Sequence, residues 1–313
     1  MRFSILAAMA LLLFHPCYGA SKPVASSPPA PLEEREISVD GYPYGVAVDV
    51  DGTIYFTVLG KTPDLVAEDN DGYIYVLKPG KTVAEKFSME GDFSAPKALA
   101  LDKDNLYVID IDHLMVLDKK TGKMVGHVNF GTDGPMKYLN GVVLLGDGRV
   151  ITSCTDRNKI YISDPRTKTY GELVTKVPLN KPAGLAWDAE NKILYIAEND
   201  AGEEKKKIVG KGRLLKMDIV TGDVTAMEST FNKFRGQYGN LQLVDNELYF
   251  SDWMKNKTPE ALQKVNLKSN RVTKLARSAM QDVAGFVIRG NQYIAPSMKD
   301  QKIIISNLPK DKR

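Results

Sequence analysis

The stretch KPAGLAWD at residues 181–188, followed by ILYIAE at residues 193–198, decides the fold. The first segment is apolar and ends in an acidic turn residue, and the second is rich in β-branched and aromatic residues, as strands are. A polar loop then opens into a third apolar segment, RLLKMD, at residues 213–218. Three short segments in this order predict one antiparallel sheet unit.

The same order of segments recurs along the whole chain. Matching pairs of strands are expected at residues 45–49 and 54–58, 98–102 and 105–108, 140–145 and 149–153, and 239–243 and 247–250. Repeats of about 40 to 50 residues that each hold up to four short strands are typical of a β-propeller. The sequence therefore predicts an all-β fold, a six-bladed β-propeller in one domain over residues 34–310.

The sixth repeat is incomplete, and this predicts how the ring closes. Only three strands are expected near the C-terminus, at residues 284–288, 292–295 and 302–306. A propeller joins its last blade to its first, because an open ring would leave exposed strand edges. We expect residues 36–39 to supply the missing strand, so that an N-terminal strand completes the last blade. A five-bladed ring with a loose sixth segment is the alternative.

Residues 1–33 are expected to lie outside the propeller. Residues 1–20 carry one early charge, then an apolar run and small residues, which is the layout of a secretory signal peptide. A lipid anchor on Cys17 is the alternative, although the small residue expected before such a cysteine is missing. Residues 21–33 are rich in Pro, Ser and Ala and predict a disordered leader. We expect a periplasmic or secreted protein without a membrane span, because the apolar run is shorter than the about 20 residues that a bilayer requires.

Composition narrows the kinds of partner and chemistry. The 42 basic and 39 acidic residues nearly balance, which argues against a nucleic-acid surface. Only His113 and His127 follow the signal peptide, so neither a Ser-His-Asp triad nor a histidine zinc site is expected. Charged residues 203–207 predict a solvated loop. Cys154 is expected to be a small buried hydrophobe, and the protein a monomer.

Residues 42–56, YPYGVAVDVDGTIYF, resemble the NHL repeat, whose pattern is Pro, any residue, Gly-Val-Ala-Val-Asp, and then Gly, any residue, Ile-Tyr-Val. Residues 181–197 match this pattern nearly as well. Over residues 36–308 the chain resembles the six-bladed propellers that include NHL proteins, strictosidine synthase and the SMP-30/gluconolactonase family. The resemblance implies the fold and says little about activity, because these motifs encode strand packing.

The likeness to the gluconolactonase-like enzymes implies a second hypothesis, a metal-dependent lactonase, which is a hydrolase. Those enzymes hold a divalent metal at the top of the channel with Glu, Asn and Asp side chains. Oxygen ligands suit a hard cation such as calcium, which polarises the lactone carbonyl and activates water. Asn140 fits the family pattern, but Ala183 stands where a second amide is needed. Asn140, Glu198 and Asn240 are the remaining candidates for metal ligands.

Polar and aromatic candidates are expected to gather on one rim of the ring. In a propeller, the loops that leave the second strands share a face with the loops that enter the inner strands, and aromatic side chains add area and hydrogen bonds there. The candidates for ligand binding are Tyr44, Tyr138, Asn140, Glu198, Tyr238, Asn240, Asp252 and Trp253. The leading hypothesis is an exported soluble propeller that binds a small ligand or a partner protein on this rim, without catalysis of its own.

Overall fold

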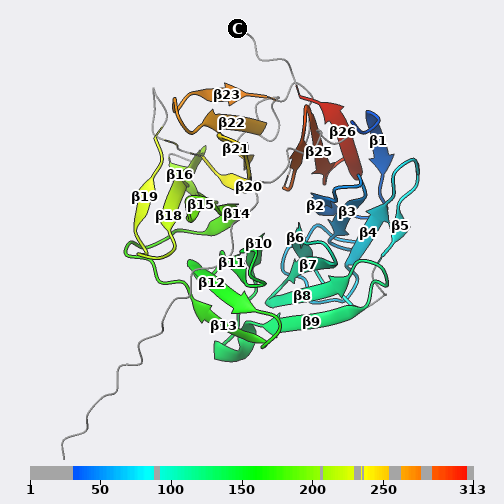
Figure 1. Ribbon diagram of the computed structural model, residues 1–313, viewed down its shortest axis with the longest axis horizontal. Coiled ribbons are helices and arrows are strands. Elements are labelled where there is room, and N and C mark those ends of the chain that lie inside the picture. The colour runs from blue at the N-terminus through cyan, green and yellow to red at the C-terminus, as the bar shows by residue number, and fades with distance from the viewer. Residues whose placement is uncertain are drawn as a thin grey trace, which may run out of the picture.

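Six four-stranded antiparallel sheets are arranged in a ring around a central channel in the computed structural model (Figure 1). The structure describes residues 31–87, 92–204, 207–228, 234, 236–253, 262–275 and 284–308. The 3-10 turn Gly131–Asp133 accompanies the strands. The predicted six-bladed all-β propeller is confirmed.

Each of the first five blades runs from an inner strand at the channel to an outer strand at the outer edge of the disc. In chain order the blades are β2 (Pro43–Val48), β3 (Ile54–Val58), β4 (Tyr73–Leu77) and β5 (Glu85–Lys86); β6 (Pro96–Leu101), β7 (Asn105–Asp110), β8 (His113–Asp118) and β9 (Met124–Asn129); β10 (Leu139–Leu144), β11 (Val150–Cys154), β12 (Lys159–Asp164) and β13 (Thr169–Glu172); β14 (Pro182–Asp188), β15 (Ile193–Glu198), β18 (Leu214–Asp218) and β19 (Val224–Ala226); and β20 (Tyr238–Val244), β21 (Glu247–Asp252), β22 (Leu262–Asn266) and β23 (Val272–Lys274).

The sixth blade joins the two ends of the described chain. Its strands are β24 (Val287–Arg289), β25 (Gln292–Ser297) and β26 (Lys302–Asn307), and β1 (Arg35–Ser38) pairs antiparallel with β26 as the outer strand. The predicted closure by an N-terminal strand is therefore confirmed. The chain is already held at Leu32, whose backbone N–H and C=O bond to the Gln292 side chain at 2.7 and 2.8 Å.

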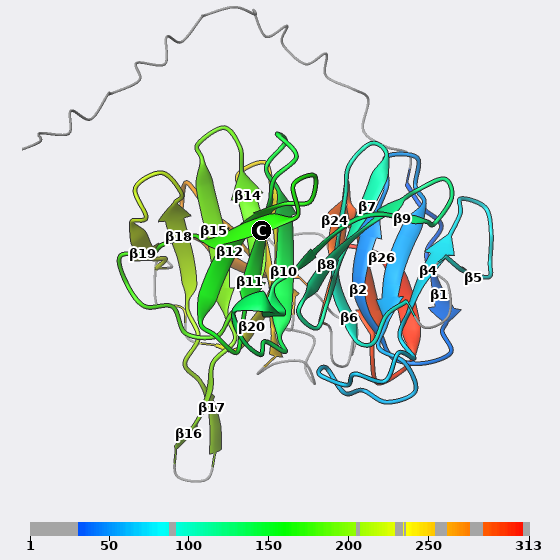
Figure 2. The same cartoon turned by 90° about the horizontal axis from the view of Figure 1, so that it is seen from below.

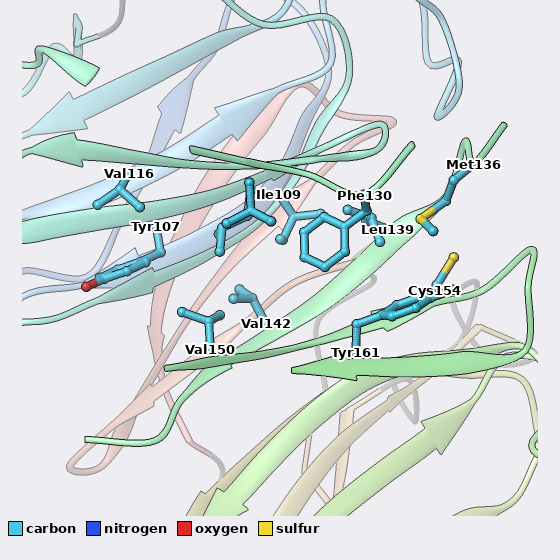
Figure 3. Packing of buried hydrophobic residues seen from close by; sticks show 12 residues of the cluster. Tyr107, Ile109, Val116, Phe130, Met136, Leu139, Val142, Val150, Cys154 and Tyr161 are labelled. Atoms are coloured by element: carbon cyan, nitrogen blue, oxygen red, sulfur yellow. The ribbon is translucent and has the colours of Figure 1, made fainter. Parts of the chain in front are cut away.

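The core lies between neighbouring blades rather than inside one blade. The second strands β3, β11 and β25 are buried along their whole length because the preceding blade covers one face of each and the following blade covers the other. Figure 3 shows one such layer, in which Phe130 and Tyr161 pack beside Val142 between blades two and three. Cys154 is fully buried in this layer, as expected for a small hydrophobe.

One segment differs from the sequence prediction. Where the charged run predicts a solvated loop, the backbone forms a hairpin of β16 (Ala201–Glu204) and β17 (Lys207–Gly210), and residues 205–206 lie outside the described part. The hairpin projects from one face of the disc (Figure 2). The β-branched pair in the sequence KIVG favours a strand there, a signal that the surrounding charges obscure.

Candidate functional site

The candidate site is the end of the channel at which the six inner strands begin, here called the channel mouth. A cavity of about 60 Å³ lies there. Its polar and aromatic lining consists of Tyr44, Lys97, Asn140, Asn199, Asn240 and Trp253. These side chains come from blades one to five, so the mouth joins groups that are far apart in the sequence.

Glycines let the inner strands come this close. A Cβ added to Gly45 would lie 2.2 Å from the Lys97 carbonyl oxygen, and one added to Gly184 would lie 2.2 Å from the Gly239 carbonyl oxygen. Real side chains do not approach a backbone atom so closely. The Gly in the repeat motif therefore serves the contact between neighbouring blades, and it narrows the channel at the mouth.

A β-bulge begins the inner strand of each of the first five blades. A bulge leaves one residue out of the ladder, so its amide needs another acceptor. In blade one the Gly45 N–H donates to Thr57 Oγ1 at 2.7 Å, and in blade three the Gly141 N–H donates to Ser153 Oγ at 2.7 Å. These buried hydroxyls fix the backbone at the mouth.

Three aromatic residues stand together at the mouth. The Tyr44 and Trp253 ring centroids are 6.5 Å apart, and Tyr138 is close enough to Tyr44 to affect its pKa. Burial raises the pKa of Tyr138 to about 12, and it raises the pKa of Tyr44 well above its usual value with a smaller contribution from Tyr138. Both tyrosines are therefore neutral phenols that can donate and accept hydrogen bonds.

Two asparagines, one from blade three and one from blade five, contribute amides to the mouth. Asn140 Nδ2 donates to Thr155 Oγ1 at 3.2 Å, and Asn240 Nδ2 donates to the Phe286 carbonyl at 3.1 Å. Each amide nitrogen carries two N–H groups, so these bonds orient the side chains without using all their hydrogen-bonding capacity.

The acidic candidates hold the loops of the rim together instead of lining the cavity. Glu198 is 1% exposed, and its two oxygens accept bonds of 2.6 and 2.7 Å from Arg213 and one of 2.8 Å from the Asn180 N–H. Asp252 is also buried and accepts from the Gln237 N–H at 3.3 Å. Tyr238 is buried edge-on against Phe250 between blades four and five.

The structure thus brings Tyr44, Asn140, Asn240 and Trp253 to one cavity, with Tyr138 beside it. Asn140 and Asn240 share the mouth, whereas Glu198 is turned to Arg213. Among the described residues, no three His, Cys, Asp or Glu side chains gather as a metal site would need. The metal site stays a prediction.

Like Asn199, Lys97 lines the mouth but is not in the set of candidates. It is 1% exposed, and its Nζ donates to the Leu65 and Ala95 carbonyls at 2.9 and 3.1 Å and lies 5.3 Å from the Tyr138 ring centroid. Burial lowers its pKa to about 8, an effect that Asp110 opposes. The sequence feature that could have identified Lys97 is its place as a lysine inside an otherwise apolar inner strand, SAPKALAL.

Beyond the mouth the channel widens. A space of about 430 Å³ is lined by the later residues of the inner strands, among them Leu101, Leu144, Trp187 and Gln242. Gln242 bridges blades five and six, because its Nε2 donates to the Ile288 carbonyl at 3.1 Å and its Oε1 accepts from the Ile288 N–H at 2.6 Å. Trp253 therefore marks the mouth, and Trp187 marks the far end.

Comparison with known proteins supports the fold and leaves the family open. No protein-family model matches the sequence, and no curated protein matches it either. A solved protein of unknown function from Bacteroides thetaiotaomicron has 12% sequence identity and a TM-score of 0.63, over 90% of this chain and 74% of its own. A chain in a nidogen/laminin complex has 16% identity and a TM-score of 0.55, over 75% and 80%.

At these identities the likeness concerns the fold alone. The chain is a six-bladed β-propeller, a class whose members place binding sites on the rim or in the channel. The resemblance to NHL and SMP-30 proteins beyond the fold stays a prediction. None of the described residues forms a helix long and apolar enough to cross a bilayer.

Proposed function

We propose that this propeller is an exported binding protein that holds a small polar ligand at the channel mouth and has no catalytic activity of its own. The observation that carries the proposal is the convergence of five blades on one cavity, with amide, phenol and indole groups in its lining. A concave site with a few polar groups from several elements is the usual form of a ligand site.

The surroundings of the cavity indicate the kind of ligand. The charges nearby already have partners inside the protein, since Glu198 faces Arg213 and Lys97 faces two carbonyls. The groups that remain are neutral. The amides and phenols both donate and accept hydrogen bonds, and the Trp253 indole donates. The cavity suits one small uncharged polar group, with the rest of the ligand lying on the rim against Trp253.

A thermal-shift screen tests this proposal. Purified protein would be screened against small polyols, amides, amino acids and nucleosides, and each hit repeated with the Asn140→Ala/Asn240→Ala double variant. We expect the hit to be lost, while loss of the two side-chain hydrogen bonds lowers the free energy of unfolding by about 1 kcal/mol each. Lys268→Ala, an exposed change on the opposite rim, is the matched control and should keep the hit.

The lactonase hypothesis is tested separately. Calcium, magnesium and zinc would be added back to metal-free protein, and both the melting temperature and the hydrolysis of simple lactones would be recorded. Binding through Asn140, Asn240 and Glu198 would raise the melting temperature with one of these metals, because a ligand that binds the folded state stabilises it. Metal-dependent hydrolysis lost in the double variant would replace the non-catalytic proposal.

Export is tested by the N-terminus of the mature protein. We expect cleavage near Ser21 and extraction without detergent, since a cleaved signal peptide removes the apolar run and Cys17. An intact, acylated Cys17 would establish the lipid-anchored alternative.

A further inference from the structure

The connection between β3 and β4, residues 59–72, crosses the face of the propeller that carries the mouth. It lies on the same face as the β16–β17 hairpin (Figure 2). We call it the strap. Its backbone is not part of any strand.

Both ends of the strap are firmly held. At the start, the Leu59 N–H donates to the Tyr42 carbonyl at 2.9 Å. At the end, the Gly72 N–H donates to the Phe93 carbonyl at 3.0 Å, and Asn70 forms two 3.2 Å bonds with Ser94. The strap is therefore fixed to blades one and two at both ends, as a hinged segment would be.

The middle of the strap is attached chiefly at Leu65. Its carbonyl accepts the 2.9 Å bond from Lys97 Nζ, and its side chain packs on the cluster at the mouth that contains Tyr44 and Trp253. A second contact is the ion pair between Glu68 and Lys137, at 2.9 Å with both side chains more than half exposed. Such an exposed pair contributes at most about 1 kcal/mol.

Lys97 is an unusual contact for the strap, because its ammonium group is buried and bonds to backbone carbonyls instead of a carboxylate. The charges that face it come from several elements: Asp64 on the strap, Asp110 at the end of β7, Asp112 just after it, and Asp156 after β11. These acids favour the charged lysine, and burial disfavours it more strongly. Asp110 is itself occupied by the N–H groups of residues 94 and 95, at 2.8 and 2.7 Å.

We propose that the strap is a lid over the channel mouth, latched by Lys97 and able to open at Leu65 to admit the ligand. This inference rests on the proposed function for its purpose, whereas the motion itself can be tested without any ligand. Opening removes the Leu65 side chain from the aromatic cluster at the mouth and exposes the Lys97 ammonium to water.

The protonation of Lys97 gives the opening a predictable pH dependence. In the closed protein its pKa is about 8, and in water it is 10.5. The open strap therefore binds more protons than the closed strap between these two values, so the closed strap becomes more stable as the pH rises through this range. Below about pH 8 both forms are protonated, and the balance no longer depends on this lysine.

Thiol labelling tests the proposal. In a Leu65→Cys protein the thiol packs on the cluster at the mouth while the strap is closed, and it becomes accessible when the strap opens. We expect its protection from labelling, relative to a free thiol at the same pH, to be flat below about pH 8. Above this value the protection should rise by up to about tenfold per pH unit toward pH 10.5. Cys154, which is fully buried in the core, is the internal control and should stay unlabelled.

Two variants keep the test decisive. Lys97→Met removes the titrating group, and Lys97→Arg keeps a charge that does not titrate in this range, so neither should show the rise. Far-ultraviolet circular dichroism confirms that each variant is folded. Protection that is flat across the range with Lys97 present, or an equal rise in the folded Lys97 variants, would overturn the latch. A failed ligand screen would leave these results unchanged.

Discussion

At the scale of single residues, the repeat motif serves contact between blades more than it serves the ligand. Gly184 and Gly45 stand where neighbouring inner strands touch, and their hydrogens fill space that a methyl group cannot enter. The polar residues beside them, Asn140 and Asn240, are then brought into one cavity by the same close approach.

The glycine contact makes a direct prediction. Gly184→Ala should lower the free energy of unfolding by about 2 to 3 kcal/mol, because the new Cβ would lie 2.2 Å from the Gly239 carbonyl and must displace backbone. Urea unfolding measures the change. Gly171→Ala on the outer strand β13 is the matched control, since nothing lies within 4 Å of its added Cβ. Equal effects of the two changes would mean that the ring tolerates wider spacing at the mouth.

Glu198 makes a second prediction at this scale. Arg213→Met removes both of its charged donors and leaves a carboxylate that is 1% exposed, so we expect a loss of about 3 kcal/mol in unfolding free energy. Adding Glu198→Gln to this variant should restore most of the loss, as a double-mutant cycle would show. If the second change instead deepens the loss, the carboxylate has a stabilising role apart from Arg213.

At the scale of elements, blade six is attached to blade five by side chains. The Gln242 side-chain amide bonds to both the N–H and the C=O of Ile288, as a backbone peptide group does in a sheet. Two residues earlier along each segment, the Asn240 side chain donates to the Phe286 carbonyl. These side-chain amides hold the short inner strand β24 against blade five.

Replacement of this amide tests the attachment. Gln242→Met should lower the unfolding free energy by about 1 to 2 kcal/mol, because it leaves the Ile288 N–H and C=O without their partner. Lys216→Met, an exposed change on β18, should alter it by less than about 0.5 kcal/mol. Faster hydrogen exchange confined to β24 and β25 would show that the loss is local.

The elements were predictable from the sequence to different degrees. The second strands stand out because burial on both faces demands continuous apolar residues, and the turns after them carry Asp, Asn or Gly. Tyr44, Asn140 and Asn240 could be placed at the mouth because each lies where an inner strand starts. The Arg213 partner of Glu198 and the direction of Lys97 depend on which loops meet in space, and no local pattern encodes that.

At the scale of the whole molecule, closure of the ring rests on the N-terminal segment. β1 covers the edge of β26, and Leu32 is bonded to Gln292 before the strand begins. The segment therefore joins the blade that contains the C-terminal strands, and it covers the edge that β26 would otherwise expose.

Truncation measures how much this seam contributes to thermal stability. Removal of residues 1–30 should leave the melting temperature unchanged, while removal of residues 1–40 should lower it by several degrees, since β1 with the buried Ile37 is lost. Removal of residues 1–33 should give an intermediate value, because the Leu32 bonds go and β1 stays. Equal melting temperatures for all three proteins would argue that β1 contributes little to closure.

The two tryptophans provide the most direct test of ligand binding at the mouth. Trp253 lines the mouth and Trp187 lines the far end, so Trp187→Phe and Trp253→Phe each leave one fluorophore at one end of the channel. The ligand found by the thermal-shift screen would be titrated into both variants. We predict a saturable change in emission from Trp253 in the Trp187→Phe protein and none from Trp187 in the Trp253→Phe protein. A saturable change from Trp187 alone would place the ligand at the far end and contradict binding at the mouth.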